Sequence, residues 1–226
     1  MSGLPPVIAI DGPSGSGKGT VAQAVAEVLH FHYLDSGALY RLVALAADRR
    51  GIPLNEENRL AELASSLDVK FVSSDIILSK EKVTDDIRSE ACGRGASLVG
   101  ALALVRQALL RRQQEFRQAP GLVADGRDMA TVVFPDARLK IYLTATAKAR
   151  AERRHKQLKQ KGITANITVL LQDLQDRDAR DESRSVAPLK QSPDARLLDT
   201  TAMSIADAVK QVLEWYRGLE IGDARP

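Results

Sequence analysis

A glycine-rich stretch near the start of the chain has the residue types and the spacing to bind phosphate. It reads GPSGSGKGT and follows a short apolar run, Val7 to Ile10. Glycines allow backbone N–H groups to point at phosphate oxygens, and a lysine at a helix entrance reaches the outer phosphates. A flexible linker would require neither the lysine nor the apolar strand before it. The sequence therefore predicts a nucleoside triphosphate site formed by Gly12, Pro13, Ser14, Gly15, Ser16, Gly17, Lys18, Gly19 and Thr20.

The residue after Lys18 bears on how a metal ion would be held. It is Gly19, where many phosphate loops place a serine or threonine whose hydroxyl binds Mg²⁺. Either Thr20 supplies an oxygen one residue later, or the ion is held mainly through water and a carboxylate from elsewhere. Asp125 follows a second apolar run, Leu122 to Ala124, and is a candidate for that carboxylate, although it could equally cap a turn. We therefore expect Mg²⁺ near Thr20 and Asp125, bound directly or through water.

Basic residues are clustered, although the formal net charge is only +3. Arg150, Arg153 and Arg154 lie close together, and like charges at such spacing repel unless an anion comes between them. Aromatic residues make up only 4% of the chain, too few for the stacking surfaces of typical nucleic-acid binders. The clusters therefore favour a phosphorylated small molecule over nucleic acid as the ligand.

Strand-like and helix-like stretches alternate along the chain, which predicts an α/β fold with a parallel sheet covered by helices. The strands are expected at 7–10, 122–124, 139–143 and 196–199, and the helices at 20–29, 38–50, 56–67, 97–118, 147–161, 167–180 and 204–216. Three short alternating pieces at 69–72, 76–78 and 83–84 predict a small antiparallel unit inserted into this alternation.

Several classes of protein are disfavoured by composition. Cys92 is the only cysteine, which rules out an internal disulfide or a thiolate zinc cluster and predicts a buried, inert thiol. No apolar run reaches the roughly 18 residues of a membrane span, and the first residues lack the features of a signal peptide. We expect a cytoplasmic protein with no membrane partner.

Four further motifs follow the glycine-rich stretch: LDSGALYR (34–41), ADGRDM (124–129), VVFPDA (132–137) and RDARDESRSVAPL (177–189). Together with GKGT they resemble the bacterial cytidylate kinase family of nucleoside monophosphate kinases. The motifs span nearly the whole chain in the family's order and are far more specific than the phosphate loop alone. The resemblance implies a three-layer fold of the P-loop nucleoside-triphosphate-hydrolase type, with an inserted monophosphate-binding subdomain and a helical lid.

The same resemblance implies a reaction, in which the γ-phosphoryl group of Mg·ATP passes to CMP or dCMP, giving CDP or dCDP and ADP. It places the acceptor among Ser36, Arg41, Ser97, Arg106, Arg127, Asp128, Arg177, Asp181 and Arg184, with Arg177 and Asp181 near the ribose and Arg184 near the phosphate. Catalytic roles fall to Lys18, Arg154, Arg180 and Arg184. A carboxylate can accept from the amino group that cytosine has and uracil lacks, so we expect Asp128 to select the base.

The resemblance also suggests how the chain is divided. We expect a core kinase domain over 1–50 and 95–226, with a lid at about 150–190, and the monophosphate-binding subdomain over 51–94. A monomer that binds ATP and CMP or dCMP, and no nucleic acid, is expected. One departure stands out, because the family commonly has glycine after Arg-Asp-Met and this chain has Ala130.

Two other functions remain open at the level of sequence. A kinase of another small acceptor, such as dephospho-coenzyme A or shikimate, would use the same loop, and acceptor profiling separates it from a CMP kinase. A nucleotide-dependent regulatory or RNA-binding protein would instead show salt-sensitive RNA binding and slow hydrolysis without an acceptor.

Overall fold

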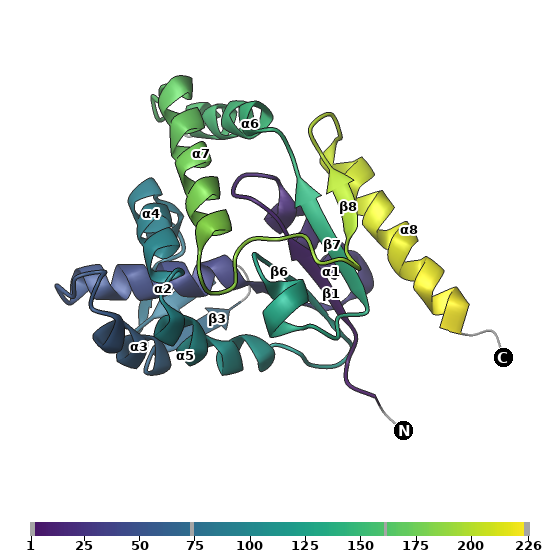
Figure 1. Cartoon of the computed structure of the whole chain (residues 1–226), viewed down its shortest axis with the longest axis horizontal. Coiled ribbons are helices and arrows are strands. Elements are labelled where there is room, and N and C mark those ends of the chain that lie inside the picture. Colours follow the sequence, from purple (N-terminus) through teal and green to yellow (C-terminus); the bar gives the residue numbers. More distant parts are fainter. Residues whose placement is uncertain (1–2, 73–74, 161, 224–226) are drawn as a thin grey trace. The chain divides into compact units, whose positions relative to one another are not determined.

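The computed structural model describes residues 3–72, 75–160 and 162–223 (Figure 1). It separates into two compact units, one formed by Met1–Leu34 with Phe116–Pro226 and the other by Asp35–Glu115. We refer to them as the first and the second unit.

A five-stranded sheet forms the centre of the first unit, in the order β2 (His32–Asp35), β6 (Leu122–Gly126), β1 (Val7–Asp11), β7 (Leu139–Thr144) and β8 (Arg196–Asp199). Strand β1 pairs in parallel with both β6 and β7, and β7 pairs in parallel with β8. This confirms the predicted α/β fold with a central parallel sheet. Strand β2 was not predicted, because its sequence, HYLD, has no run of β-branched residues.

Helices α1 (Lys18–Leu29) and α8 (Ile205–Asp223) pack against the sheet and share one apolar core with it (Figure 1). The aliphatic side chains of β1 and β7, such as Ile10 and Ile141, are fully buried in that core. Strand β1 is buried along its whole length, whereas β7 (LKIYLT) alternates buried apolar residues with partly exposed polar ones. The carboxyl end of β1 therefore emerges from the middle of a rigid layer, and the glycine-rich loop starts there.

Helices α6 (Ala147–Gln160) and α7 (Ile167–Ser183) pack on each other and form most of the predicted lid region (Figure 1). Residue 161, the predicted last residue of the first of these helices, lies outside the described residues. A short π-helix, η2 (Met129–Val133), follows β6. Among the residues that the structure describes, none of the helices has the length and apolar character needed to cross a membrane.

The second unit combines helices with a small antiparallel sheet. Helix α2 (Ser36–Arg49) packs on α3 (Glu57–Ser65) and α4 (Glu90–Val99), and α3 packs on α5 (Ala103–Gln114). The sheet has the order β3 (Val69–Val72), β4 (Asp75–Leu78), β5 (Glu81–Lys82), and a short 3-10 helix, η1 (Asp86–Arg88), follows it. The unit extends on both sides of 51–94, since α2 packs on α3 and α4 and α5 packs on α3, and the bounds of the monophosphate-binding subdomain stay a prediction.

The prediction of a single helix over 97–118 was wrong. Helix α4 ends at Val99 and α5 begins at Ala103, with Gly100 capping α4. The Gly100 carbonyl accepts a hydrogen bond from Nη1 of the buried Arg106 at 2.9 Å. Glycine has a low helix propensity, which favours an interruption of the helix at Gly100. Because the helix ends there, the Gly100 carbonyl can accept a hydrogen bond from the buried Arg106 guanidinium, which needs such partners.

Replacing Gly121 with alanine is predicted to destabilise the first unit. An added Cβ would lie 2.5 Å from ring carbons of Phe31, and that ring packs edge-on against Tyr216 with centroids 5.8 Å apart. Overpacking of this kind should lower the free energy of unfolding by about 1–3 kcal/mol, measured by urea denaturation. Gly218→Ala is the matched control, since no heavy atom lies within 4 Å of its added Cβ and helix propensity favours alanine. Equal stability of the two variants would contradict the prediction.

Candidate functional site

The glycine-rich loop requires glycine for reasons that the backbone makes plain. Gly15 and Gly17 have φ angles of 73° and 96°, in the left-handed region that favours glycine. A Cβ on Gly12 would lie 2.0 Å from the carbonyl oxygen of Leu143 on β7. The loop therefore turns tightly against the sheet before α1 begins, which is the arrangement that a phosphate-binding loop needs.

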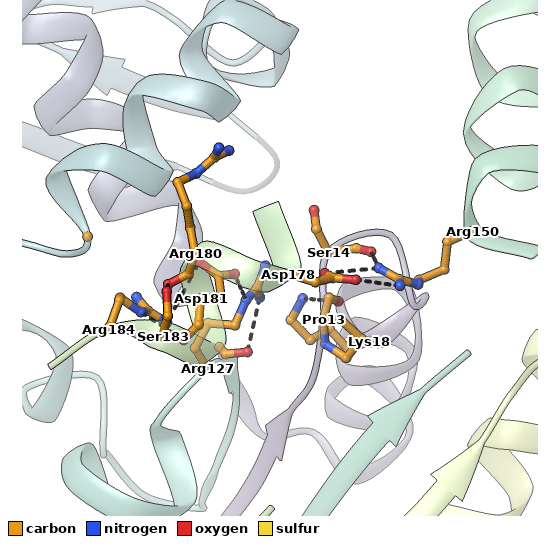
Figure 2. A network of polar contacts seen from close by, with 12 residues as sticks. Pro13, Ser14, Lys18, Arg127, Arg150, Asp178, Arg180, Asp181, Ser183 and Arg184 are labelled. Atoms are coloured by element: carbon orange, nitrogen blue, oxygen red, sulfur yellow. Dashed lines mark hydrogen bonds and ion pairs between the residues drawn. The ribbon is translucent and has the colours of Figure 1, made fainter. Parts of the chain in front are cut away.

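Lys18 is the first residue of α1 and is only 9% exposed. Its Nζ donates to the carbonyl oxygen of Pro13 at 3.3 Å, so the ammonium group lies over its own loop (Figure 2). The start of a helix adds partial positive charge at the same place. Lysine and helix together can attract and neutralise the phosphates of a nucleotide.

Asp125, at the end of β6, lies beside the residue that follows Lys18. A Cβ added to Gly19 would be 3.8 and 3.9 Å from the two Asp125 carboxylate oxygens and 3.5 Å from the Tyr33 hydroxyl. That hydroxyl donates to Asp125 Oδ1 at 2.7 Å. With glycine at this position, no side-chain hydroxyl is present after Lys18, and the Asp125 carboxylate lies beside the same point, oriented by Tyr33. Carboxylate oxygens are ligands that Mg²⁺ prefers.

Asp11 ends β1 and is 2% exposed. Its two oxygens accept hydrogen bonds from the backbone N–H groups of Met129 at 2.9 Å and Ala130 at 2.8 Å. Burial raises the pKa of this carboxyl from 3.8 to about 6, although both N–H groups lower it. The side chain of Ala130 is accommodated in the core at 2% exposure, so the departure from glycine at this position leaves the turn intact.

Two arginines converge on Asp181 of α7 (Figure 2). Arg127 Nε donates to Asp181 Oδ2 at 2.7 Å, and Arg184 Nε donates to the Asp181 carbonyl at 3.2 Å. Burial alone would raise the pKa of the Asp181 carboxyl, but Arg127, Arg177 and Arg184 outweigh it and lower that pKa. Burial alone would lower the pKa of the Arg127 guanidinium, and Asp181 reverses that effect and raises it. The structure thus gathers these four predicted acceptor residues.

Arg150 is buried and bonded on several sides (Figure 2). Its two terminal nitrogens reach the Asp178 carboxylate at 3.1 and 2.5 Å, and its Nη1 also donates to the Ser14 carbonyl at 2.9 Å. Arg153 donates to the Ser16 carbonyl and to Thr200. The expectation that an anionic ligand separates these arginines therefore needs correction, because a carboxylate and backbone carbonyls already balance Arg150 and Arg153.

Of the five remaining predicted acceptor residues, Asp128 lies buried in the first unit, and the other four lie in the second unit. Arg41 Nη1 donates to the Ile87 carbonyl at 2.6 Å, and its guanidinium lies 3.1 Å from where a Cβ of Gly93 would be. Gly93 and Ser97 are four residues apart on α4 and so share a face of that helix. Arg106 lies over the Tyr40 ring at 5.6 Å from its centroid. Ser36, the first residue of α2, is buried after the capping residue Asp35.

Three predicted residues lie nearer the surface. Arg154 donates to Gln157 on its own helix at 3.5 Å, Arg180 is exposed, and Thr20 is exposed at the start of α1. Figure 2 shows the Arg180 side chain pointing away from the Arg127 and Asp181 pair. Their predicted roles in catalysis and metal binding stay predictions.

Three residues with functional potential were not singled out from the sequence: Asp11, Tyr33 and Asp178. Arg150 was predicted, but as part of a cluster around an anionic ligand and not as the partner of Asp178. Asp11 had a signal, since a carboxylate directly before a phosphate loop ends a buried strand. Arg150 and Asp178 are 28 residues apart, and only packing of α6 on α7 brings them together. No local pattern could pair them.

A family model described as cytidylate kinase matches residues 8–218. The chain belongs to the cytidylate kinase family. Two relatives with the name cytidylate kinase are similar over nearly their full length. The protein from Chromobacterium violaceum is 61% identical over 93% of this chain and 95% of its own. The protein from Polynucleobacter necessarius is 59% identical over 94% of this chain and 99% of its own.

A solved structure supports the fold alone. An uncharacterized protein from Eubacterium ventriosum superposes with a TM-score of 0.51 at 12% identity, over 97% of this chain and 99% of that one. Cytidylate kinase family membership thus accounts for the phosphate loop, while the contacts of Asp11, Arg150 and Asp178 come from this structure.

The raised pKa of Asp11 predicts a pH dependence of stability. Between its ordinary value of 3.8 and about 6, the folded state keeps a proton that the unfolded state has lost. The Asp11 contribution to the free energy of unfolding is therefore complete below about pH 4 and is lost as pH rises through about 6. The free energy of unfolding of wild type and of Asp11→Asn is measured by urea denaturation from about pH 5 to pH 7. As pH rises, the value for wild type should fall relative to that for Asp11→Asn.

Asp136→Asn is the control for this measurement. The hydrogen bond from Arg117 lowers the pKa of Asp136, so this carboxyl titrates below the tested pH range. The difference in the free energy of unfolding between wild type and Asp136→Asn should therefore stay constant across that range. If the free energy of unfolding changed with pH equally in wild type and in Asp11→Asn, the raised pKa of Asp11 would be contradicted.

Proposed function

We propose that this chain is a cytidylate kinase, which transfers the γ-phosphoryl group of Mg·ATP to CMP or dCMP and releases ADP with CDP or dCDP. The observation that carries the proposal is the pairing of a phosphate loop on β1 with an arginine and a carboxylate, Arg127 and Asp128, directly after β6. Strands β1 and β6 are neighbours in register, with Asp11 opposite Gly126. Relatives named cytidylate kinase share this chain over nearly its whole length.

The reaction requires positioning and charge neutralisation more than proton transfer. The acceptor oxygen belongs to a phosphate that is ionised at neutral pH, so no general base is needed. Lys18 balances charge on the donor phosphates, and the arginine cluster balances charge on the acceptor. Arg127 and Asp181 are already locked together, so their geometry is set before the substrate arrives.

Residues beside the phosphate loop fit a magnesium ion. Within the part of the chain that the structure describes, no three His, Cys, Asp or Glu side chains gather into a metal site. An ion brought with ATP would therefore rely on phosphate oxygens, water and a single carboxylate, which suits Mg²⁺. We assign that carboxylate to Asp125 on its placement beside Gly19, with Thr20 as a candidate for contacts through water. Mg²⁺ held at Asp125 would supply positive charge next to the donor phosphates.

The proposed acceptor residues fall into two groups, one in each unit. Arg127, Asp128, Arg177, Asp181 and Arg184 belong to the first unit, and Ser36, Arg41, Ser97 and Arg106 to the second. Guanidinium groups bind phosphate oxygens with paired hydrogen bonds, which suits Arg127 and Arg184 of the first unit to a monophosphate. Arg154 and Arg180 are proposed to act on the transferring phosphoryl group when the lid region closes.

The monomeric state, the cytoplasmic location and the absence of nucleic-acid or membrane partners remain predictions from the sequence. A kinase of dephospho-coenzyme A or shikimate, or an RNA-binding phosphate-loop protein, has no comparable support. The decisive experiment is a steady-state assay of ADP release with Mg·ATP and each nucleoside monophosphate. CMP and dCMP should be preferred. Preference for a non-nucleotide acceptor would overturn the proposal.

Lys18→Ala should lower the rate of phosphoryl transfer by about 100-fold or more, because it removes positive charge from oxygens where transition-state charge accumulates. Thermal unfolding of the variant is measured beside the assay, so that a loss of activity can be separated from a loss of folded protein. Lys156→Ala, at an exposed position on α6, is the control and should keep full activity. Near-normal turnover of folded Lys18→Ala would exclude this lysine from the mechanism.

Asp128→Ala should narrow the preference for CMP over UMP. Asp128 is 3% exposed, and a buried carboxylate facing the uracil carbonyl would be repelled where cytosine offers an amino group. Such a mismatch costs on the order of 1–3 kcal/mol. In Asp128→Ala the ratio of kcat/KM for CMP to kcat/KM for UMP should therefore fall about tenfold or more. Both acceptors are measured under identical Mg·ATP conditions. An unchanged ratio would place base selection elsewhere.

A further inference from the structure

Helix α7 carries two carboxylates that hold arginines from different parts of the first unit. Asp178 and Asp181 are three residues apart and therefore lie on one face of the helix, about 4.5 Å apart along its axis. Asp181 binds Arg127 at the end of β6, and Asp178 binds Arg150 of α6 (Figure 2). One turn of helix thus connects both arginines.

Arg150 continues this connection into the phosphate loop. Its Nη1 donates to the Ser14 carbonyl at 2.9 Å, and its Nε donates to the Ala145 carbonyl at 2.9 Å. Its planar fork meets both oxygens of Asp178, an arrangement that fixes orientation as well as distance. Arg150 is 4% exposed, and its guanidinium contacts three separate chain segments, at Ser14, Ala145 and Asp178.

The charges make this contact dependent on the placement of α7. A buried guanidinium is strongly disfavoured without a carboxylate partner, and Asp178 is the carboxylate bonded to Arg150. If α7 moved away from the loop, Arg150 would have to keep its carbonyl contacts as an uncompensated charge or give them up. The ion pair therefore favours arrangements in which α7 lies against the phosphate loop.

We propose that Asp178 and Arg150 are positioning residues for phosphoryl transfer, forming a clasp that fastens α7 to the phosphate loop at Ser14. This rests on the proposed function, because it assigns the loop to the donor and Arg127 with Asp181 to the acceptor. Through a short length of rigid helix, the clasp sets the distance between the phosphate loop and the pair of Arg127 and Asp181. In-line transfer depends steeply on that distance, since a displacement of about 1 Å can cost 100-fold in rate.

A positioning role predicts a particular kinetic pattern. Neither residue is assigned to contact either substrate, so ground-state binding should survive the loss of the clasp while the aligned reactive complex should not. Asp178→Asn keeps the size of the side chain and removes the charge. We expect its kcat to fall about 10- to 100-fold, with the KM for CMP and the affinity for a non-hydrolysable ATP analogue each within about threefold of wild type.

Asp176→Asn is the matched control. It is the same substitution on the same helix, at an exposed residue whose carboxylate accepts from Gln172 on α7. It should leave kcat and KM unchanged. A fall in kcat that is equal in Asp176→Asn and Asp178→Asn would assign the effect to the helix as a whole and overturn the clasp.

A double-mutant cycle tests whether the two residues act together. In an Arg150→Gln background, Asp178→Asn should lower kcat little further, because the contact is already lost. Additive losses would overturn the proposal. Arg150→Lys keeps the charge without the fork and should give an intermediate kcat. This variant also serves as the test if Asp178→Asn does not fold, and wild-type kcat in Arg150→Lys would then count against the clasp.

Hydrogen exchange separates failure of the clasp from failure of the proposed function. With the ATP analogue bound and no acceptor present, amides of α7 should exchange faster in Asp178→Asn than in wild type or Asp176→Asn. If wild type did not phosphorylate CMP, the proposed function would be wrong, but the exchange of the α7 amides would still test the clasp. Unchanged α7 exchange together with wild-type kcat in Asp178→Asn would overturn the clasp alone.

Discussion

The arrangement of the candidate site depends on the hydrogen bonds that the buried Asp11 carboxylate accepts. This carboxylate stands at the end of the central strand, directly before the phosphate loop, and its two oxygens hold the N–H groups of Met129 and Ala130. The turn that carries Arg127 and Asp128 is therefore fixed to the same strand end as the donor loop. Burial raises the pKa of this carboxyl to about 6, because a charged carboxylate is disfavoured away from water. Such costs are commonly found at functional sites, where geometry matters more than local stability.

Buried arginines around the loop extend the same principle. Arg127 and Arg150 are each neutralised by a carboxylate on α7, and Arg150 and Arg153 also donate to loop carbonyls. Pairing lets the protein hold a high density of positive charge before any phosphate is bound, so little reorganisation is required during transfer. A cluster of arginines in the sequence thus has two different uses. Arg150 and Arg153 contact the phosphate loop itself, while the roles of Arg154 and Arg180 toward substrate stay predictions.

Gly19 gives the phosphate loop its particular character. Without a side chain at this position, the Tyr33 hydroxyl and the Asp125 carboxylate lie next to the start of α1. The loop hydroxyl of many related sites is thus absent, and an oriented carboxylate is present beside the same point. A nucleotide kinase can rely on this because ATP brings most of the ligands of its own metal ion.

The sequence by itself determined the phosphate loop, the alternation of strands and helices, and the family, since glycine spacing and hydrophobic periodicity are local signals. It also singled out Arg127, Asp128 and Asp181, although as residues carried over by resemblance. Tertiary structure decided the rest. The break between α4 and α5, strand β2 and the extent of the second unit depend on packing that no short window of sequence records. The joining of Arg150 to Asp178 and of Asp11 to the 129–130 turn spans 28 and more than 100 residues, and which buried charge finds which partner is settled only when the helices and strands pack.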